Sequence, residues 1–570
     1  MRPGYSLSPL VLALSLALAP AAQASTTMEV TGADGSVWAT LSIGDASDNA
    51  GLAADEAMRS ITSAELQAVK DSIYYWSDVL GAGATVPVIE ISPLVTVADN
   101  ASAGSDLVGS SGETLLQAAL LGHDTSRQEG ADREPTTGIE LYAAASIERE
   151  ALTLNPLSRN GMSFHLTSII VHEVMHALGM VADVSKETGT LSDEGSSLFA
   201  SHLVDVYGTS ASQGVTFQTV TEDELKNLDG IEHGTKSRDE SVFYVLSDDK
   251  HGSEASGVKF AGTNVTEVIG ATTAIYYADT DFLVQNEETG TWSVVDPTIA
   301  NSVIGGIPVN GNEGGSVGLE LSHLELQNSL MSHQSWRNWA LPMEAELAVL
   351  QDLGYTIDRK RYFGTSIYSS GSYNDAAITI SQAFWAREAG EWVTGVASTQ
   401  TGAVGVHVYG SLNEVTIAAD QLADGAESFG VRVDGQMNDI TLDSGYTVSA
   451  NGTNGTGIAF TYGNSHTLTL EAGSTVSAAG EGGKALVFDF GSNLLGNSDA
   501  YRGSYINASV SSGYWTNTAR LGTLSAIDGA LVETVNISGA VSAPSGTAIY
   551  ISENALVSTI NVKSGATISG

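Results

Sequence analysis

Two histidines and a glutamate in one short apolar stretch are the residues whose types and spacing could carry out chemistry. His172 and His176 are four residues apart, so on a helix both imidazoles lie on one face. At this spacing the two rings can hold one Zn²⁺ ion, and Glu173 projects beside them as a candidate general base. The rest of the segment 169–180 is mostly apolar, and polar groups in a buried helix are costly unless they are paired or bound to a metal. Residues 161–179 therefore predict a buried zinc-binding helix.

A catalytic zinc site normally has three protein ligands and an open position for water. The third ligand must therefore come from outside the pair, and Gly179 allows the chain to turn back toward the metal. His165, two turns before His172, is one candidate ligand. It could equally be a residue on the helix surface, or one that contacts a metal-binding side chain without binding the metal. Asp183 offers a carboxylate just after the helix, and His323 offers an imidazole in a polar, turn-like segment far downstream. We favour His323.

The elements that must position these residues can be inferred from the flanking sequence. A capping box, Thr62-x-x-Glu65, precedes a helical apolar pattern that continues to Leu80. Predicted strands span residues 37–43, 86–97 and 138–145, and a predicted amphipathic helix spans residues 343–355. A helix, several strands and then a histidine-bearing helix form the α+β order expected for the first half of a zinc peptidase.

Composition limits the partners and the chemistry. The chain has 570 residues, which is more than one ordinary domain, and it has no cysteine. Any zinc site must therefore use histidine and carboxylate ligands. The net charge of −43 argues against binding nucleic acid or an anionic membrane through a basic patch. The expected partner is a protein or peptide substrate, with no nucleic acid, and the sequence indicates no oligomeric state.

The first residues are typical of a secretory signal peptide. Arg2 precedes an apolar run at 10–19, and residues 22–24 match the small-x-small cleavage pattern. The run is too short for a comfortable membrane span. We therefore expect residues 1–24 to be a signal peptide and the mature protein to be secreted or held at the cell surface.

From about Gly364 the sequence changes to short alternating segments between glycine- and serine-rich turns. Four similar segments end at Gly410, Gly435, Gly463 and Gly491, at spacings of 25, 28 and 28 residues. Companion segments lie at 414–417, 439–442 and 467–470, and a last copy pairs 548–551 with 559–562. Irregular repeats with two-residue periodicity predict a β-solenoid, in which each coil stacks on the next. His407 and His466 are expected at its surface.

Beyond the zinc helix, the order of several motifs resembles a known family. Ser322-His323, Leu330-Met331 and the closing segment 348–355 follow a long insertion. In this order residues 60–360 resemble the metzincin zinc peptidases, and among them the leishmanolysin-like branch, whose third histidine lies far beyond the glycine. That branch is rich in cysteine and this chain has none, so its insertion must be built differently.

The resemblance implies a specific set of site residues. These are His172, His176 and His323 as Zn²⁺ ligands, Glu173 as general base, and Met331 as the residue of the methionine turn beneath the metal. His333, two residues after Met331, lies where some metzincins have a tyrosine that reaches the metal, or else is an exposed loop residue. The distance from His323 to Met331 is shorter than in the leishmanolysin-like branch.

The repeat region resembles the passenger stalk of a Gram-negative autotransporter in composition and architecture. Such proteins finish with a membrane β-barrel, so contact with the outer membrane is expected only through a C-terminal barrel that this sequence does not contain. We therefore expect the sequence to be a fragment. The expected organisation is a signal peptide at 1–24, a zinc metallopeptidase domain at 25–363 with a large insertion at about 180–318, and an all-β solenoid at 364–570.

Together these features predict a secreted or cell-surface zinc endopeptidase that hydrolyses peptide bonds with a metal-activated water and Glu173 as general base. The alternative is a non-catalytic surface adhesin, an autotransporter passenger whose peptidase-like domain is a binding module. Acidic clusters in the insertion lack the spacing of an EF-hand, so the sequence does not predict a calcium site. Cleavage preference and activation are not indicated either.

Overall fold

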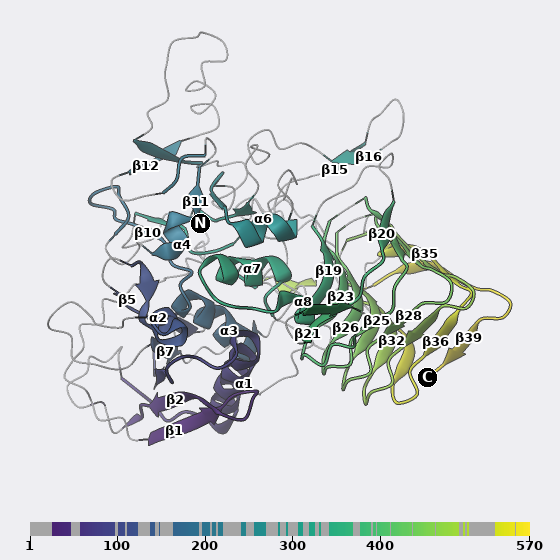
Figure 1. Cartoon of the computed structure of the whole chain (residues 1–570), viewed down its shortest axis with the longest axis horizontal. Helices are drawn as coiled ribbons and strands as arrows, with labels where there is room; N and C mark the ends of the chain where they lie inside the picture. Colours follow the sequence, from purple (N-terminus) through teal and green to yellow (C-terminus); the bar gives the residue numbers. More distant parts are fainter. Residues whose placement is uncertain are drawn as a thin grey trace, which may run out of the picture.

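The computed structural model contains a mixed α/β region followed by a stack of parallel β-sheets, and the two lie side by side (Figure 1). The stack extends from Phe363 to Ser569. The structure describes residues 26–46, 49, 57–96, 101–108, 111–123, 137–142, 147–148, 164–192, 197–205, 208–211, 215–220, 241–246, 256–269, 283–285, 292–294, 306–311, 318–324, 330–331, 341–368, 377–388, 391–394, 396–410, 412–435, 437–461, 463–489, 494–495, 499–500, 530–552 and 555–570. The predicted signal peptide at 1–24 lies outside these residues.

A five-stranded mixed sheet forms one layer of the α/β region, in the order β1-β2-β3-β7-β4. Its strands are β1 (Thr26–Thr31), β2 (Val37–Ile43), β3 (Val88–Pro93), β7 (Thr137–Leu141) and β4 (Ala101–Gly104). Strands β2, β3 and β7 are parallel, whereas β1 and β4 are antiparallel strands at the two edges. The central strands bury Leu41, Ile91 and Ile139, as expected for parallel strands covered by helices.

Helix α1 (Ser63–Leu80) begins at the predicted capping box. Thr62 Oγ1 accepts a hydrogen bond from the Glu65 N–H at 3.2 Å, and Glu65 Oε2 accepts one from the Thr62 N–H at 2.9 Å. Arg59 forms a two-pronged ion pair with the same carboxylate at 2.8 and 2.9 Å. Burial raises the pKa of Glu65, but Arg59 and the Thr62 hydrogen bonds outweigh it, so this pKa lies below its usual value.

The zinc-helix prediction corresponds to helix α3 (Leu166–Ala177), which packs along α1 and against the sheet. Ser72 Oγ on α1 donates a hydrogen bond to the Thr167 carbonyl at 3.0 Å. The helix is shorter than predicted, because Phe164 and His165 form the two-residue strand β9, which pairs with β8 (Ile147–Glu148). The expectation that His165 lies on the zinc helix is therefore wrong.

Short elements build the rest of the α/β region. They are β5 (Leu107–Val108), β6 (Glu113–Thr114), α2 (Leu115–Leu121), β10 (Asp183–Val184), α4 (Leu198–Ser201), β11 (Leu203–Val204), β12 (Thr216–Val220), β13 (Val242–Leu246), β14 (Lys259–Phe260), α6 (Thr263–Ile269), β15 (Leu283–Gln285), β16 (Trp292–Val294), β17 (Ile307–Pro308), β18 (Leu319–Glu320), α7 (Glu344–Asp352) and α8 (Arg359–Tyr362). The predicted strand at 37–43 is confirmed as β2. The predictions at 86–97 and 138–145 correspond to the shorter strands β3 and β7, and the predicted helix at 343–355 corresponds to the shorter α7.

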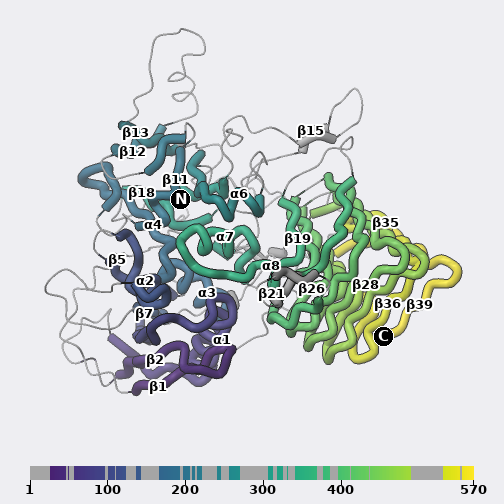
Figure 2. The backbone as a smooth tube through the Cα atoms, viewed as in Figure 1, coloured from purple at the N-terminus to yellow at the C-terminus, as the bar shows by residue number. Residues whose placement is uncertain are grey.

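The region from Phe363 onward consists of three parallel sheets stacked in register, consistent with a β-solenoid (Figure 2). The first sheet contains β19 (Phe363–Ile367), β23 (Val404–Val408), β26 (Phe429–Val433), β29 (Thr456–Phe460), β32 (Lys484–Phe488) and β37 (Thr547–Ile551). The second contains β20 (Ile378–Ile380), β24 (Glu414–Ile417), β27 (Asp439–Leu442), β30 (His466–Leu470), β35 (Val532–Ile537) and β38 (Val557–Val562). The third contains β25 (Gln421–Leu422), β28 (Thr447–Ser449), β31 (Thr475–Ser477), β36 (Ala540–Ser542) and β39 (Thr567–Ser569). Two hairpins branch from the stack, β21 (Trp385–Glu388) with β22 (Glu391–Thr394), and β33 (Leu494–Leu495) with β34 (Asp499–Ala500).

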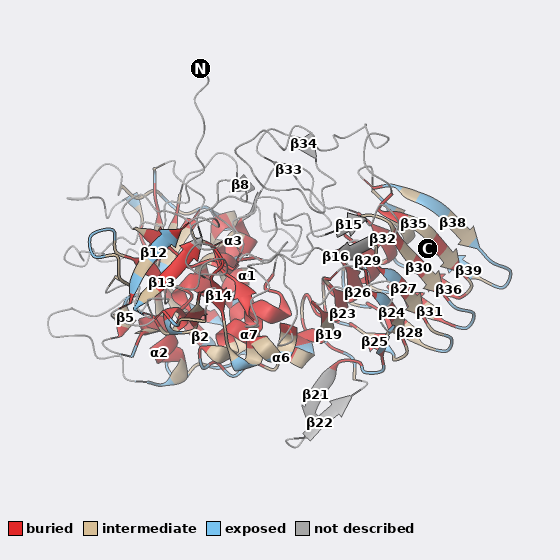
Figure 3. Ribbon diagram, turned by 90° about the horizontal axis from the view of Figure 1, so that it is seen from above, coloured by how far each residue is buried: buried red, intermediate tan, exposed pale blue. Residues whose placement is uncertain are grey.

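The register of the stack places like residues above one another. Val406, Val431, Ile458 and Leu486 are successive partners in the first sheet, and all four are fully buried. Burial decreases toward the last coil, where β38 and β39 are coloured tan and pale blue in Figure 3. The predicted pairs of strands in each repeat are therefore confirmed.

The outer face of the first sheet is also buried, and this overturns one expectation. His407, on the first sheet, and His466, on the second, were expected at the surface, but their exposed fractions are 1% and 0%. His466 is buried for a different reason, because it alternates with the buried Leu468 and Leu470 of β30. On the first sheet the outward-facing Ala459 and Val487 belong to the same core cluster as the α/β region. Packing between the two regions therefore removes this face from solvent.

A buried charge cluster lies on that face. Asp434 Oδ2 lies 2.9 Å from His407 Nε2 and accepts a hydrogen bond from Arg432 Nε at 3.0 Å, and Thr461 Oγ1 donates to the other carboxylate oxygen. Because His407 and Arg432 are partners on neighbouring strands, the cluster joins successive coils. Burial raises the pKa of Asp434, but the charge of Arg432 and the bond from His407 hold it well below its usual range.

The Phe429→Ala variant tests whether the two regions share one core. Phe429 is 1% exposed and packs in the cluster that contains Leu347 and Tyr362. Its truncation should lower the free energy of unfolding by about 3–5 kcal/mol, and helix and sheet signals should melt together at a lower temperature. Thermal unfolding followed by circular dichroism measures both. Ile568→Ala, at an exposed position of β39, is the control and should have a smaller effect. Two separate transitions, with only one shifted, would contradict the shared core.

Asp434→Asn should destabilise the protein by about 3–5 kcal/mol, because Arg432 would then be a buried charge without its counter-ion. The lowered pKa also sets a pH dependence: the stabilisation by Asp434 is present above the ordinary aspartate pKa of about 4 and is lost as pH falls through the folded value. Urea unfolding at a series of pH values should therefore show a shallower acid loss in the variant than in the wild type. Asp424→Asn, at an exposed carboxylate, is the control, and equal effects of the two substitutions would refute the prediction.

Candidate metal centre

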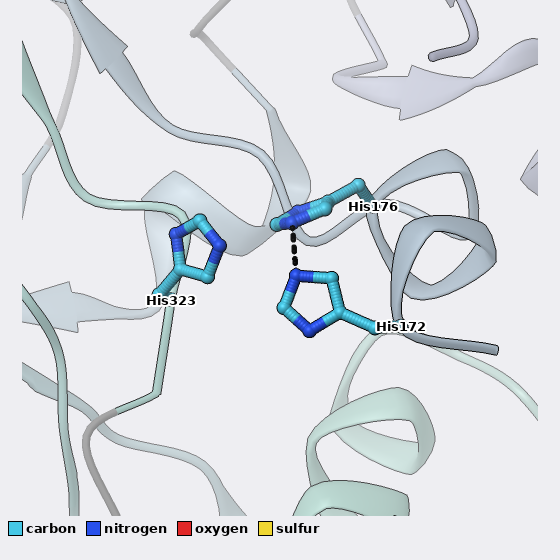
Figure 4. A group of neighbouring side chains, drawn as sticks. All are labelled: His172, His176 and His323. Carbon is cyan, nitrogen blue, oxygen red and sulfur yellow. Dashed lines mark hydrogen bonds between the residues drawn. The ribbon is translucent and has the colours of Figure 1, made fainter. Parts of the chain in front are cut away.

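Three histidines from distant parts of the chain form one buried group. His172 and His176 lie on α3, and His323 follows β18 (Figure 4). One ring nitrogen of each lies within 4.8 Å of the others. Their exposed fractions are 7%, 6% and 4%. The structure thus brings together the three residues predicted as metal ligands, in a group that could hold a metal ion.

A short antiparallel ladder brings His323 to the helix. Strand β10, just after α3, pairs with β18, so that Asp183 lies opposite Glu320. The ladder continues through a hydrogen bond from the Leu321 N–H to the Ala182 carbonyl at 2.8 Å. Ser322 Oγ accepts a further bond from the Ala182 N–H at 3.1 Å. The ends of the long insertion are therefore held together beside the metal group.

Asn310 fixes the backbone of His323 from the other side. The His323 N–H donates to Asn310 Oδ1, and the Asn310 N–H donates to the His323 carbonyl, both at 3.1 Å. Asn310 is fully buried and follows β17. The insertion therefore contributes to the position of the third histidine, and sequence reasoning did not identify this role.

Two backbone carbonyls orient the helix histidines. His172 Nδ1 lies 2.7 Å from the Leu330 carbonyl oxygen, and His176 Nδ1 lies 2.8 Å from that of Met180. Because a carbonyl oxygen can only accept, each Nδ1 must carry a proton, and in the neutral imidazole each Nε2 then keeps a lone pair. Both lone pairs are therefore available to a metal ion.

The distance between those two nitrogens is compatible with a metal ion bound by both. His172 Nε2 and His176 Nε2 are 3.2 Å apart (dashed line in Figure 4). A proton on one Nε2 would make this contact an N–H···N hydrogen bond, and a metal ion bound by both nitrogens would replace that proton. Two nitrogens bound about 2.0–2.1 Å from one tetrahedral Zn²⁺ lie about 3.3 Å from each other. The geometry of the pair therefore fits a shared zinc ion.

A tight turn holds the carbonyl that orients His172. The Met331 N–H donates to Glu346 Oε1 at 2.8 Å, and the Met343 N–H donates to Glu346 Oε2 at 2.6 Å. Glu346 is fully buried in the first turn of α7. This carboxylate therefore ties the Leu330–Met331 turn to α7. Met331 itself is fully buried, as expected of a packing residue.

Glu173 lies beside the histidines and faces the edge of the sheet. Its carboxylate Oε2 accepts a hydrogen bond from the Ala103 N–H at 3.2 Å. Ala103 belongs to β4, the antiparallel edge strand, and this N–H is therefore directed away from the neighbouring strand β7. Glu173 is half-buried, so its carboxylate is less enclosed than the three imidazoles.

One other candidate, Asp183, lies outside the group. Within the part of the chain that the structure describes, Asp183 is buried in the β10–β18 ladder and is not a member of the three-histidine group. His165 belongs by its backbone to β9. His333 lies outside the described residues, so its role as a residue near the metal stays a prediction.

Comparisons of the chain with protein-family models, with curated proteins and with solved structures found no match. The description of the site therefore rests on its geometry alone. Among the helices that the structure describes, none combines the length and the apolar character needed to cross a bilayer.

His323→Ala should weaken zinc binding strongly, because two imidazoles remain where three are present. Metal content after dialysis, measured by elemental analysis, should fall well below one equivalent in the variant. His123→Ala is the matched control, since His123 is exposed and pairs with Glu113 away from the site. Wild-type metal content in the His323 variant would show that another residue, such as Asp183, completes the coordination.

Proposed function

We propose that this protein is a zinc-dependent endopeptidase. The observation that carries the proposal is the group of three buried imidazoles, two of them with Nε2 atoms 3.2 Å apart, with a carboxylate beside them on the same helix. Imidazole ligands suit several transition metals, and zinc is the choice when the neighbouring carboxylate acts on a water. The order of motifs that resembles the metzincins agrees with this proposal.

Glu173 performs the proton transfers in the proposed reaction. A bound zinc ion supplies an acidified water and polarises the scissile carbonyl. Glu173 accepts the proton of the attacking water and then delivers it to the nitrogen of the leaving amine. The Ala103 N–H, 3.2 Å from its Oε2, holds the carboxylate on the side of the site that faces β4. Half-burial of Glu173 keeps its carboxylate accessible to a substrate.

Strand β4 offers a means of aligning a peptide substrate. It is an edge strand of the sheet, and its Ala103 N–H binds Glu173, so the strand lies directly beside the candidate base. An extended peptide can add to such an edge through main-chain hydrogen bonds, which recognise the backbone rather than particular side chains. An endopeptidase that accepts unfolded protein segments is therefore the activity that this arrangement favours.

We further propose that the protein acts outside the cytoplasm. The support is the sequence of residues 1–24, which has the pattern of a secretory signal peptide. In this proposal the parallel stack from Phe363 serves as the stalk of an exported surface protein, and it carries the metal site at one side of its first coils.

Glu173→Gln separates catalysis from metal binding. The variant should retain one equivalent of zinc, but its cleavage rate should fall at least about a hundredfold. Proton transfer by a positioned base typically accelerates a reaction by about 10²–10⁴-fold. The assay is chelator-sensitive cleavage of a denatured protein by the purified full chain. Glu187→Gln, at an exposed position, is the control.

Two outcomes would contradict the proposal. Equal cleavage by Glu173→Gln and wild type would remove Glu173 from the mechanism. A wild-type protein that holds zinc but cleaves none of a panel of unfolded substrates would favour the binding module of a surface adhesin instead.

A further inference from the structure

We propose that Glu320 is a positioning residue for the metal, which orients His323 and supplies a negative charge beside this ligand. The inference rests on the proposed metal site but goes beyond the three ligands and the base. Nothing in the sequence pattern assigned Glu320 a role. The inference is argued from the contact between Glu320 and His323, from the burial of both side chains, and from the difference between His323 and the other two histidines.

The contact joins a ring nitrogen to a carboxylate oxygen. His323 Nδ1 lies 3.2 Å from Glu320 Oε1, and the two side chains are only 5% and 3% exposed. Figure 4 shows the other ring nitrogen of His323 directed toward His172 and His176. The His323 ring therefore directs Nε2 toward the other two histidines and Nδ1 toward Glu320.

The three histidines differ in what holds them. The Nδ1 atoms of His172 and His176 face neutral backbone carbonyls, whereas that of His323 faces a carboxylate. His323 Nδ1 and Glu320 Oε1 lie at ion-pair distance rather than in hydrogen-bond geometry. A carboxylate this close to the ring still makes the imidazole a better electron donor to a metal through its negative charge. A carboxylate also offsets part of the charge of a divalent ion bound by three neutral rings.

The ladder that carries His323 also fixes Glu320. Glu320 is the last residue of β18 and lies opposite Asp183 of β10 in the antiparallel pair. His323 follows three residues later, after the Leu321 and Ser322 contacts with Ala182. One pairing therefore sets the positions of the ligand and of the carboxylate behind it.

The test compares zinc affinity in the full-length wild type, Glu320→Gln and Glu320→Asp, by competition with a chelator of known affinity. Loss of the charge in Glu320→Gln should weaken zinc binding by about 10–100-fold, and Glu320→Asp should recover part of the loss. In the cobalt-substituted protein, the visible absorption bands should shift in Glu320→Gln, because the donor strength of one ligand changes. Glu113→Gln is the matched control: Glu113 also pairs with a histidine, His123 at 2.7 Å, but outside the site.

The outcomes distinguish this proposal from the proposed function. Wild-type zinc affinity and unchanged cobalt bands in Glu320→Gln would overturn the role of Glu320 and leave the metal site and the peptidase intact. An equal drop in the melting temperature of the metal-free and zinc-loaded variant, without a change in affinity, would assign Glu320 a structural role and also overturn the proposal. If the wild type bound neither zinc nor cobalt, the metal site itself would fail, and this inference would fail with it.

Discussion

The site depends on the pairing of two strands of two residues each. Without the β10–β18 ladder, the chain that leaves α3 and the chain that arrives at His323 would have no fixed relation. Few hydrogen bonds form this ladder, and both strands are buried, so the surrounding core must hold it. Leu319 and Leu321 are almost fully buried on either side of Glu320, and the hydrophobic effect therefore stabilises the register that the polar residues need.

A second set of polar residues connects the metal group to the closing helix. Glu346 on α7 receives the N–H groups of Met331 and Met343, and the carbonyl of Leu330 in the same turn orients His172. In the same first turn of α7, the Ala345 N–H donates to the hydroxyl of Tyr368 at 3.1 Å, just after the first strand of the stack. The metal group and the parallel sheets are therefore connected through one short helix.

Local patterns could be predicted from the sequence, and long-range ones could not. The pair His172 and His176 was identifiable because four-residue spacing has a direct meaning on a helix, and His323 because of the motifs around it. Glu320 and Asn310 were missed because their roles depend on a strand register and a contact across the insertion. No local spacing encodes such contacts.

The same distinction applies to the parallel stack. Alternation of apolar residues predicted most strands of the first two sheets, since segments of four or five residues contain enough positions to show a period, but it did not predict β19, β20 or β35. The third sheet was missed because its strands are only two or three residues long. His407 was misplaced because a two-residue period assigns it to the outer face, and only the packing of Val487 and its neighbours against the α/β region buries that face.

Parallel stacking also determines which parts of the molecule can vary independently. Neighbouring strands in a sheet are about 4.8 Å apart, so one additional coil would lengthen the rod by about that amount. In such an array each later coil contacts chiefly its neighbours, so insertion or loss of a coil near β38 leaves the geometry around α3 unchanged. The coils that begin at β19 are different, because they complete the core beneath α7. The number of coils can therefore change without affecting the metal site, whereas a change in the first coils would alter the core that supports the three histidines.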